Sequence, residues 1–210
     1  MSGDATIPHP DIDLSGDVTH FFRELVDDAL RAQGSQATGA AESYVVALLA
    51  DYAKPDQLSG ETLHRPLTLL LDEAMQHSGH ERFERLRSLG DGVLYVSGFF
   101  GDHLETRGVE LAYVSALGAR AYDGAAAMLR GTPTQEQSAA PDVFAELAEN
   151  FRMFVRLVSR IAERLYAQSA CTHGSVLKLY ERWMRTGSDA LAKALAAQGV
   201  MPVRSSGMLH

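Results

Sequence analysis

The stretch at residues 90–104, GDGVLYVSGFFGDHL, decides the fold. Residues 93–100 carry no charge, and four glycines stand among the apolar side chains of the stretch. A helix that is apolar on every side is usually buried on every side, so we expect a central helix that other helices cover. Glycine weakens a helix by about 1 kcal/mol relative to alanine. The glycines therefore indicate either a close approach of another backbone or a break near residues 90–92.

A seam of alternating three- and four-residue steps extends this helix to about residues 81–105, and that spacing is typical of a packed helix. The seam consists of Phe83, Leu86, Gly90, Val93, Ser97, Phe100 and Leu104. Tyr95 and Phe99 point away from it, so a second side of the helix needs a cover. An alanine- and glycine-rich helix expected at about 109–129, another subunit, or a ligand could supply that cover.

The rest of the chain shows helical periodicity and no strand signal of any length. We predict an all-α fold, a bundle of about seven helices around the glycine- and aromatic-rich one. The other helices are expected from residue 17 or 19 to about 30, and at about 41–53, 66–77, 142–168 and 175–197. In the 142–168 helix a second seam of three- and four-residue steps runs through Phe144, Leu147, Phe151, Phe154, Val158, Ile161 and Leu165.

Composition divides the chain into one domain with two tails. Residues 1–16 are rich in Pro, Gly and Asp and are expected to be a disordered arm, and residues 199–210 a flexible tail. Residues 17–198 form the bundle, with a linker-like loop at 131–141. The N-terminus lacks the basic and apolar regions of a signal peptide, and no apolar run approaches the ~18 residues of a membrane helix. We expect a cytoplasmic protein that binds no membrane.

The formal charge is −8, which disfavours binding to nucleic acid. The single cysteine, Cys171, excludes an internal disulfide bond. Cys171 lies near His173, but nothing in the sequence indicates a substrate cleft or a lowered thiol pKa, so we interpret the pair as part of a turn at residues 169–174. No catalytic residue and no cofactor is predicted.

Two groups of residues have spacings that could suit a metal ion. Glu61 and His64 form a Glu-x-x-His motif, but di-iron bundles need two such motifs, and this one lies just before Pro66. Glu73, His77 and His80 are spaced by four and three, yet the Ser-Gly pair at 78–79 is expected to end a helix between the two histidines. We predict no metal site and treat these residues as a connector and a helix end.

Four arginines recur every four residues: Arg152, Arg156, Arg160 and Arg164. Like charges at this spacing destabilise a helix by roughly 0.2–0.5 kcal/mol per pair. All four lie off the apolar seam of their helix. They form either a solvated outer face, with Glu149 and Glu163 one turn away, or a docking face for an acidic partner or an acidic helix of a second subunit.

Tyr95, Phe99 and Phe100 are core aromatics or, alternatively, the lining of a pocket for a flat or apolar ligand. Three functional hypotheses follow. The first is a non-enzymatic interaction or regulatory module that self-associates, most simply as a homodimer. The second is a small-molecule binding or sensing bundle, and the third is a metal-dependent, oxidase-like bundle.

Overall fold

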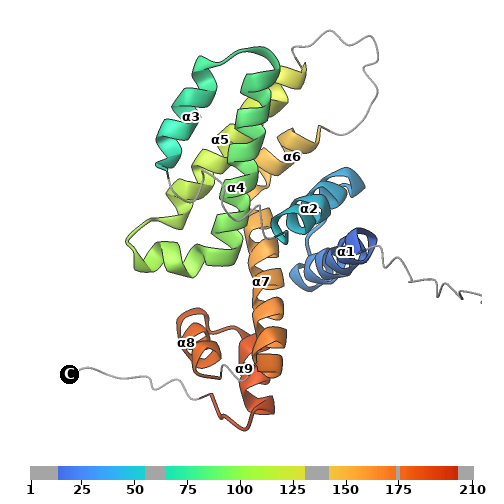
Figure 1. The fold of residues 1–210 in the computed structure, drawn as a ribbon, viewed down its shortest axis with the longest axis vertical. Helices are drawn as coiled ribbons and strands as arrows, with labels where there is room; N and C mark the ends of the chain where they lie inside the picture. The colour runs from blue at the N-terminus through green and yellow to red at the C-terminus, as the bar shows by residue number, and fades with distance from the viewer. Residues whose placement is uncertain (1–13, 55–64, 131–141, 174–175, 203–210) are drawn as a thin grey trace, which may run out of the picture.

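The computed structural model describes residues 14–54, 65–130, 142–173 and 176–202. Within these ranges the chain forms nine helices and no strand, which confirms the all-α prediction (Figure 1). The helices are α1 (Leu14–Gln33), α2 (Gly39–Tyr52), α3 (Leu67–Gln76), α4 (Gly79–Thr106), α5 (Leu111–Arg130), α6 (Val143–Glu149), α7 (Phe151–His173), α8 (Val176–Thr186) and α9 (Asp189–Ala197). None of these helices is both long enough and apolar enough to cross a membrane.

Local sequence signals set several helix ends. Thr38 caps the start of α2, where its hydroxyl accepts a hydrogen bond from the Ala41 N–H at 3.2 Å. Asp142 does the same for α6 by accepting from the Ala145 N–H at 3.1 Å. Gly187, with φ of +66°, lies between α8 and α9 in a conformation that suits glycine because it has no side chain.

Helix α4 is central, as predicted, and its most extensive packing partner is α5. Residues 92–98 are buried without exception, so the helix is covered on every side. The small residues of α5 allow a close approach: a Cβ added to Gly118 would lie 2.7 Å from Val93 of α4. Val93 belongs to the predicted seam, so α5 covers the seam side of α4; on the second side, Tyr95 stacks on Tyr52 of α2.

The buried side chains fall into two clusters. The larger one joins α1 to α7 and includes the apolar side chains of the predicted seams of α4 and of α6–α7. A smaller one consists of Leu179, Trp183, Leu191 and Leu195 of α8 and α9, packed against the C-terminal part of α7. Figure 1 shows α7 extending from the bundle to these two helices, which we call the C-terminal unit.

Several predicted boundaries are wrong. The helix predicted at 142–168 is interrupted at Asn150, which has φ of −104° and ψ of 22°, and this divides it into α6 and α7. The helix predicted at 175–197 is divided by Gly187, which the apolar pattern had placed inside it. The turn predicted at 169–174 is helical as far as His173, so α7 is longer than expected.

Helix α4 has no break at residues 90–92; its departure from helical geometry is at Phe100, with φ of −126° and ψ of 19°. At the other end of the chain, α1 begins at Leu14, before the predicted start. The predicted arm is therefore helical in its last residues, and residues 1–13 lie outside the described ranges, as do the predicted linker at 131–141 and residues 203–210 of the predicted tail.

Candidate functional site

The four arginines, which we call the arginine ladder, lie on the exposed side of α7. Residues four apart on a helix are offset by about 40° and rise about 6 Å, so the ladder winds around α7 over about 18 Å. The opposite side of α7 carries Phe154, Leu157 and Val158, which are completely buried in the bundle. Burial of this seam leaves the ladder facing outward.

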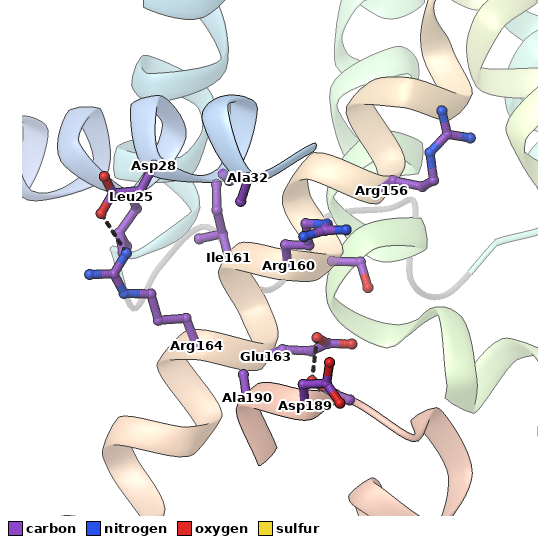
Figure 2. A pocket seen from close by; sticks show the side chains of 13 residues that line it. Leu25, Asp28, Ala32, Arg156, Arg160, Ile161, Glu163, Arg164, Asp189 and Ala190 are labelled. Carbon is purple, nitrogen blue, oxygen red and sulfur yellow. Dashed lines mark hydrogen bonds and ion pairs between the residues drawn. The ribbon is translucent and has the colours of Figure 1, made fainter. Parts of the chain in front are cut away.

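One pocket lies where α7 meets α1 and the start of α9, and we call it the α1–α7–α9 pocket (Figure 2). Its volume is about 490 Å³, and its lining includes Arg156, Arg160 and Arg164 of the ladder. Figure 2 shows Arg164 reaching toward α1, where Arg164 Nη1 donates to Asp28 Oδ2 at 2.7 Å, while Arg156 extends away from α1. This contact holds the pKa of Asp28 below its usual value.

A second pocket, of about 370 Å³, lies on the other side of the ladder between α5, α6 and α7. Arg152 and Arg156 line it together with Glu149 and with Ala116 and Ala119 of α5. Arg156 belongs to both pockets, so the ladder connects two hollows along the outer side of α7. This arrangement follows from the winding of the ladder around the helix.

Ion pairing is uneven along the ladder. Arg164 is paired with Asp28, whereas Arg152, Arg156 and Arg160 form no ion pair with any residue in the described ranges. Glu163 forms no ion pair with a described arginine, and its Oε2 accepts a hydrogen bond from the Ser188 hydroxyl at 2.7 Å.

Three acids that line these pockets form no ion pair with a described residue: Glu149, Glu163 and Asp189. Of these, Glu163 accepts the hydrogen bond from Ser188. The three free guanidinium groups are each planar donors that can bind a carboxylate through two parallel hydrogen bonds. The outer side of α7 therefore presents donors that no described acid of this chain binds.

A different charged group lies inside the bundle. Asp91 of α4 accepts hydrogen bonds at 2.7 Å from the hydroxyls of Tyr44 on α2 and Tyr122 on α5, and both bonds reach the same oxygen, Oδ1. Tyr122 has no exposed surface. Gly90 makes room for it, since a Cβ there would lie 2.6 Å from the Tyr122 ring. The three residues tie α2, α4 and α5 together.

Burial sets the ionisation of this cluster. Asp91 as a whole residue keeps some exposed surface, but protein atoms surround its carboxylate, and this desolvation raises its pKa to about 6. The two tyrosine hydrogen bonds and the positive charge of Arg87 act in the opposite direction, because they favour the carboxylate. Burial also raises the pKa of Tyr44 and Tyr122 well above the usual value, so both hydroxyls stay protonated as donors.

The three aromatic residues predicted as a ligand lining are stacked on protein side chains. Tyr95 stacks on Tyr52 of α2 with ring centroids 4.3 Å apart, and on Phe99 at 4.6 Å. Phe100 meets Tyr95 edge to face at 6.1 Å. These residues line neither of the two pockets described above. Tyr95 therefore packs on Tyr52 and Phe99 of this chain, and the ligand-binding interpretation of these residues stays a prediction.

The residues considered for a metal do not converge. Glu73 forms a two-pronged ion pair with Arg65, and His77 Nδ1 lies 3.3 Å from Glu81 Oε1. His80 begins a different helix and stacks on Phe83. No group of three or more His, Cys, Asp or Glu residues in the described part of the chain could hold a metal ion.

Glu61 and His64 lie outside the described residues, as do the side chains of Cys171 and His173.

The Asp91 cluster was not anticipated from sequence. By sequence alone, Tyr44 and Tyr122 fit the apolar sides of their helices, and Asp91 is a charge that interrupts an apolar run. A usable signal was present: an acid between two glycines inside a buried helix must find hydrogen-bond donors, and tyrosines are the apolar-compatible residues that supply them.

Comparison of the chain with models of known protein families, with curated proteins and with solved structures finds no match. The site must therefore be interpreted from its own geometry. The geometry is that of a helical bundle with the arginine ladder exposed on α7, in which Arg164 has an ion-pair partner and the other three arginines have none among the described residues.

Proposed function

We propose that this protein is a non-enzymatic interaction module that binds an acidic helical segment of a partner protein along the arginine ladder of α7. The observation that carries the proposal is the contrast within the ladder. Arg164 has an acidic partner on α1, whereas Arg156 and Arg160, in the same pocket, have none among the described residues of a chain with a net charge of −8.

The energetics of α7 support an external partner. Each pair of arginines four residues apart opposes helix formation by roughly 0.2–0.5 kcal/mol, and a carboxylate placed between two of them removes that repulsion. Among the described residues, such a carboxylate is supplied to Arg164 only, at the end of the ladder. A partner that supplies carboxylates to Arg156 and Arg160 would neutralise the remaining repulsion.

The spacing of the ladder favours a helix as the binding partner. Acids four residues apart on a partner helix rise by about 6 Å per step, as the arginines do. The hollows on either side of Arg156 leave space for the partner's side chains. An acidic helix lying along α7 can therefore place successive carboxylates at successive guanidinium groups.

A synthetic peptide provides a defined probe. The probe is a fluorescein-labelled helix of about 20 residues with Glu at every fourth position, and its control has Gln at the same positions. In fluorescence anisotropy we expect the Glu peptide to bind the full chain and the Gln peptide to bind at least about tenfold more weakly, because charge-assisted hydrogen bonds are roughly twice as strong as neutral ones. Binding should also weaken as salt rises.

The matched protein controls separate the ladder from general charge. Replacing both Arg156 and Arg160 with alanine should abolish the preference for the Glu peptide. Arg120→Ala removes an exposed arginine from α5 that lines neither pocket, and it should leave binding unchanged. Equal binding of the Glu and Gln peptides to the wild-type protein would refute the proposal.

A second copy of the chain is the first natural partner to test. The negative net charge means that each copy carries acids that another copy's ladder could bind. Self-association as a homodimer is the expectation, and native mass spectrometry at micromolar concentration measures it. A dimer that dissociates when Arg156 and Arg160 are replaced would assign the ladder to self-association, whereas a monomer would direct the search to a different acidic protein.

A further inference from the structure

The C-terminal unit has a hydrophobic core of its own. Leu191 and Leu195 of α9 are completely buried, and Trp183 of α8 is 6% exposed, in a cluster separate from that of the bundle. The unit packs on α7, with Tyr166 and Ala167 lying against its core. It therefore extends from the bundle on α7 rather than being inserted among the other helices.

Two arginines of the unit reach α4, and Arg182 is the more buried of them. Arg182 of α8 donates from Nη2 to the Phe99 carbonyl at 3.1 Å and lies 3.7 Å from the Asp102 carboxylate. Its guanidinium group also lies over the ring of Tyr166, 3.9 Å from the centroid. The side chains of Arg182 and Asp102 are only 13% and 15% exposed, so water screens this contact less than it screens an ordinary surface ion pair.

The contact coincides with the irregularity in α4. Phe100, the residue after the hydrogen-bonded carbonyl, has the non-helical backbone angles, and Asp102 follows within the same turn. Helices bend where a side chain enters the backbone hydrogen-bond pattern. Phe99 and Phe100 are also the residues that stack against Tyr95. The position of Arg182 and the local shape of the central helix are thus physically linked.

We propose that Arg182 is a latch: it holds the C-terminal unit against the bundle and maintains the bend of α4 at Phe100. When the latch is released, α8 and α9 separate from α4 and open locally more often, while the rest of the bundle stays folded. The same movement displaces Ser188 and Asp189, which form the α9 wall of the α1–α7–α9 pocket. The Arg182 contact thus controls the shape of the α1–α7–α9 pocket, at one end of the arginine ladder.

Hydrogen exchange of the full-length Arg182→Gln variant tests the latch. Loss of the charged donor should make the amides of α8 and α9 exchange about 10- to 100-fold faster, because a hydrogen bond to a charged group contributes about 1.5–3 kcal/mol. The amides of residues 100–104 should also exchange faster, since the bend of α4 loses its contact with Arg182. The amides of α1 and α2 should stay within about twofold of the wild type.

Two further variants keep the test decisive. Arg185 is the other arginine near Asp102; its side chain is 47% exposed and lies 3.6 Å from the carboxylate. Because this ion pair is exposed, Arg185→Gln should change the amide exchange rates of α8 and α9 by less than about threefold. Asp102→Asn retains the Phe99 carbonyl contact and should give an acceleration confined to α8 and α9 but smaller than that of Arg182→Gln. Fluorescence of Trp183, the only tryptophan, should report the release in Arg182→Gln.

Two results would overturn the latch. One is exchange in α8 and α9 that is unchanged by Arg182→Gln. The other is an equal acceleration throughout α1, α2, α8 and α9, which would show that the unit and the bundle open as one body. Neither result bears on the binding of the acidic peptide, which is measured separately.

Discussion

The buried carboxylate of Asp91 and the exposed guanidinium groups of Arg156 and Arg160 represent opposite ways of handling charge. Asp91 receives two 2.7 Å hydrogen bonds from the tyrosines of neighbouring helices, and its surroundings shift its pKa toward neutrality. The two arginines form no ion pair with any acid in the described part of the chain. The fold provides hydrogen-bond partners for Asp91, whereas the described residues provide no ion-pair partner for the two arginines.

The comparison indicates a structural role for Asp91 and agrees with the binding role proposed for the arginine ladder. A buried polar group costs free energy unless it is hydrogen-bonded, so Asp91, Tyr44 and Tyr122 are bound to one another and define how α2, α4 and α5 meet. An exposed arginine incurs no such cost and can remain unpaired until a ligand arrives. Changes at Asp91 should therefore alter stability, and changes at the ladder should alter binding.

The largest effect should appear in the pH dependence of stability. Asp91 has a pKa of about 6 in the folded chain and about 3.9 when unfolded, so the folded state holds the proton more tightly. Between pH 4 and pH 7 this group should lower the free energy of unfolding by about 2.3 kcal/mol as the pH rises. Urea denaturation of the wild type and of Asp91→Asn at both pH values measures it. An identical pH dependence in the two proteins would contradict the assignment.

Tyr122→Phe should have the next largest effect. It keeps the buried ring and removes one of the two donors to Asp91, which should cost about 2 kcal/mol at pH 7. Tyr113→Phe is the matched control on the same helix, because Tyr113 is 53% exposed and should tolerate the change. Equal denaturation midpoints for the two variants would mean that the Asp91 cluster contributes little to stability.

The smallest effect on stability should come from the ladder. Alanine at both Arg156 and Arg160 removes exposed charges and relieves their repulsion, so the free energy of unfolding should change by no more than about 0.5 kcal/mol. Thermal or urea denaturation measures this change beside that of Tyr122→Phe. A loss of 2 kcal/mol or more would show that these arginines have structural partners.

Periodicity accounts for what could be predicted of the fold. The seams of α4 and of α6–α7 consist of residues that are buried or packed against the core, because a single spacing rule governs which side of a helix meets its neighbours. At Gly90 neither of the two predicted explanations holds: the neighbour is the side chain of Tyr122 rather than a backbone, and the helix does not break there. The helix breaks were not predictable, because a pattern of apolar residues continues through Asn150 and Gly187 although the backbone turns there.

The sites were less predictable than the fold. The ladder is visible in sequence because its members lie on one helix, but Asp28, which pairs with Arg164, is 136 residues distant. The Asp91 cluster and the Arg182 contact likewise join residues from separate helices. Sequence spacing contains no information on such pairs until the packing of the helices is known.

A charge-reversal experiment tests the proposed function most directly. Both Arg156 and Arg160 are replaced with glutamate, and binding of two peptides is compared: the helix with Glu at every fourth position and the same helix with Lys. We expect the wild type to prefer the Glu peptide and the double variant to prefer the Lys peptide, with stability close to that of the wild type. A preference that does not reverse would contradict the assignment of the arginine ladder as the binding face.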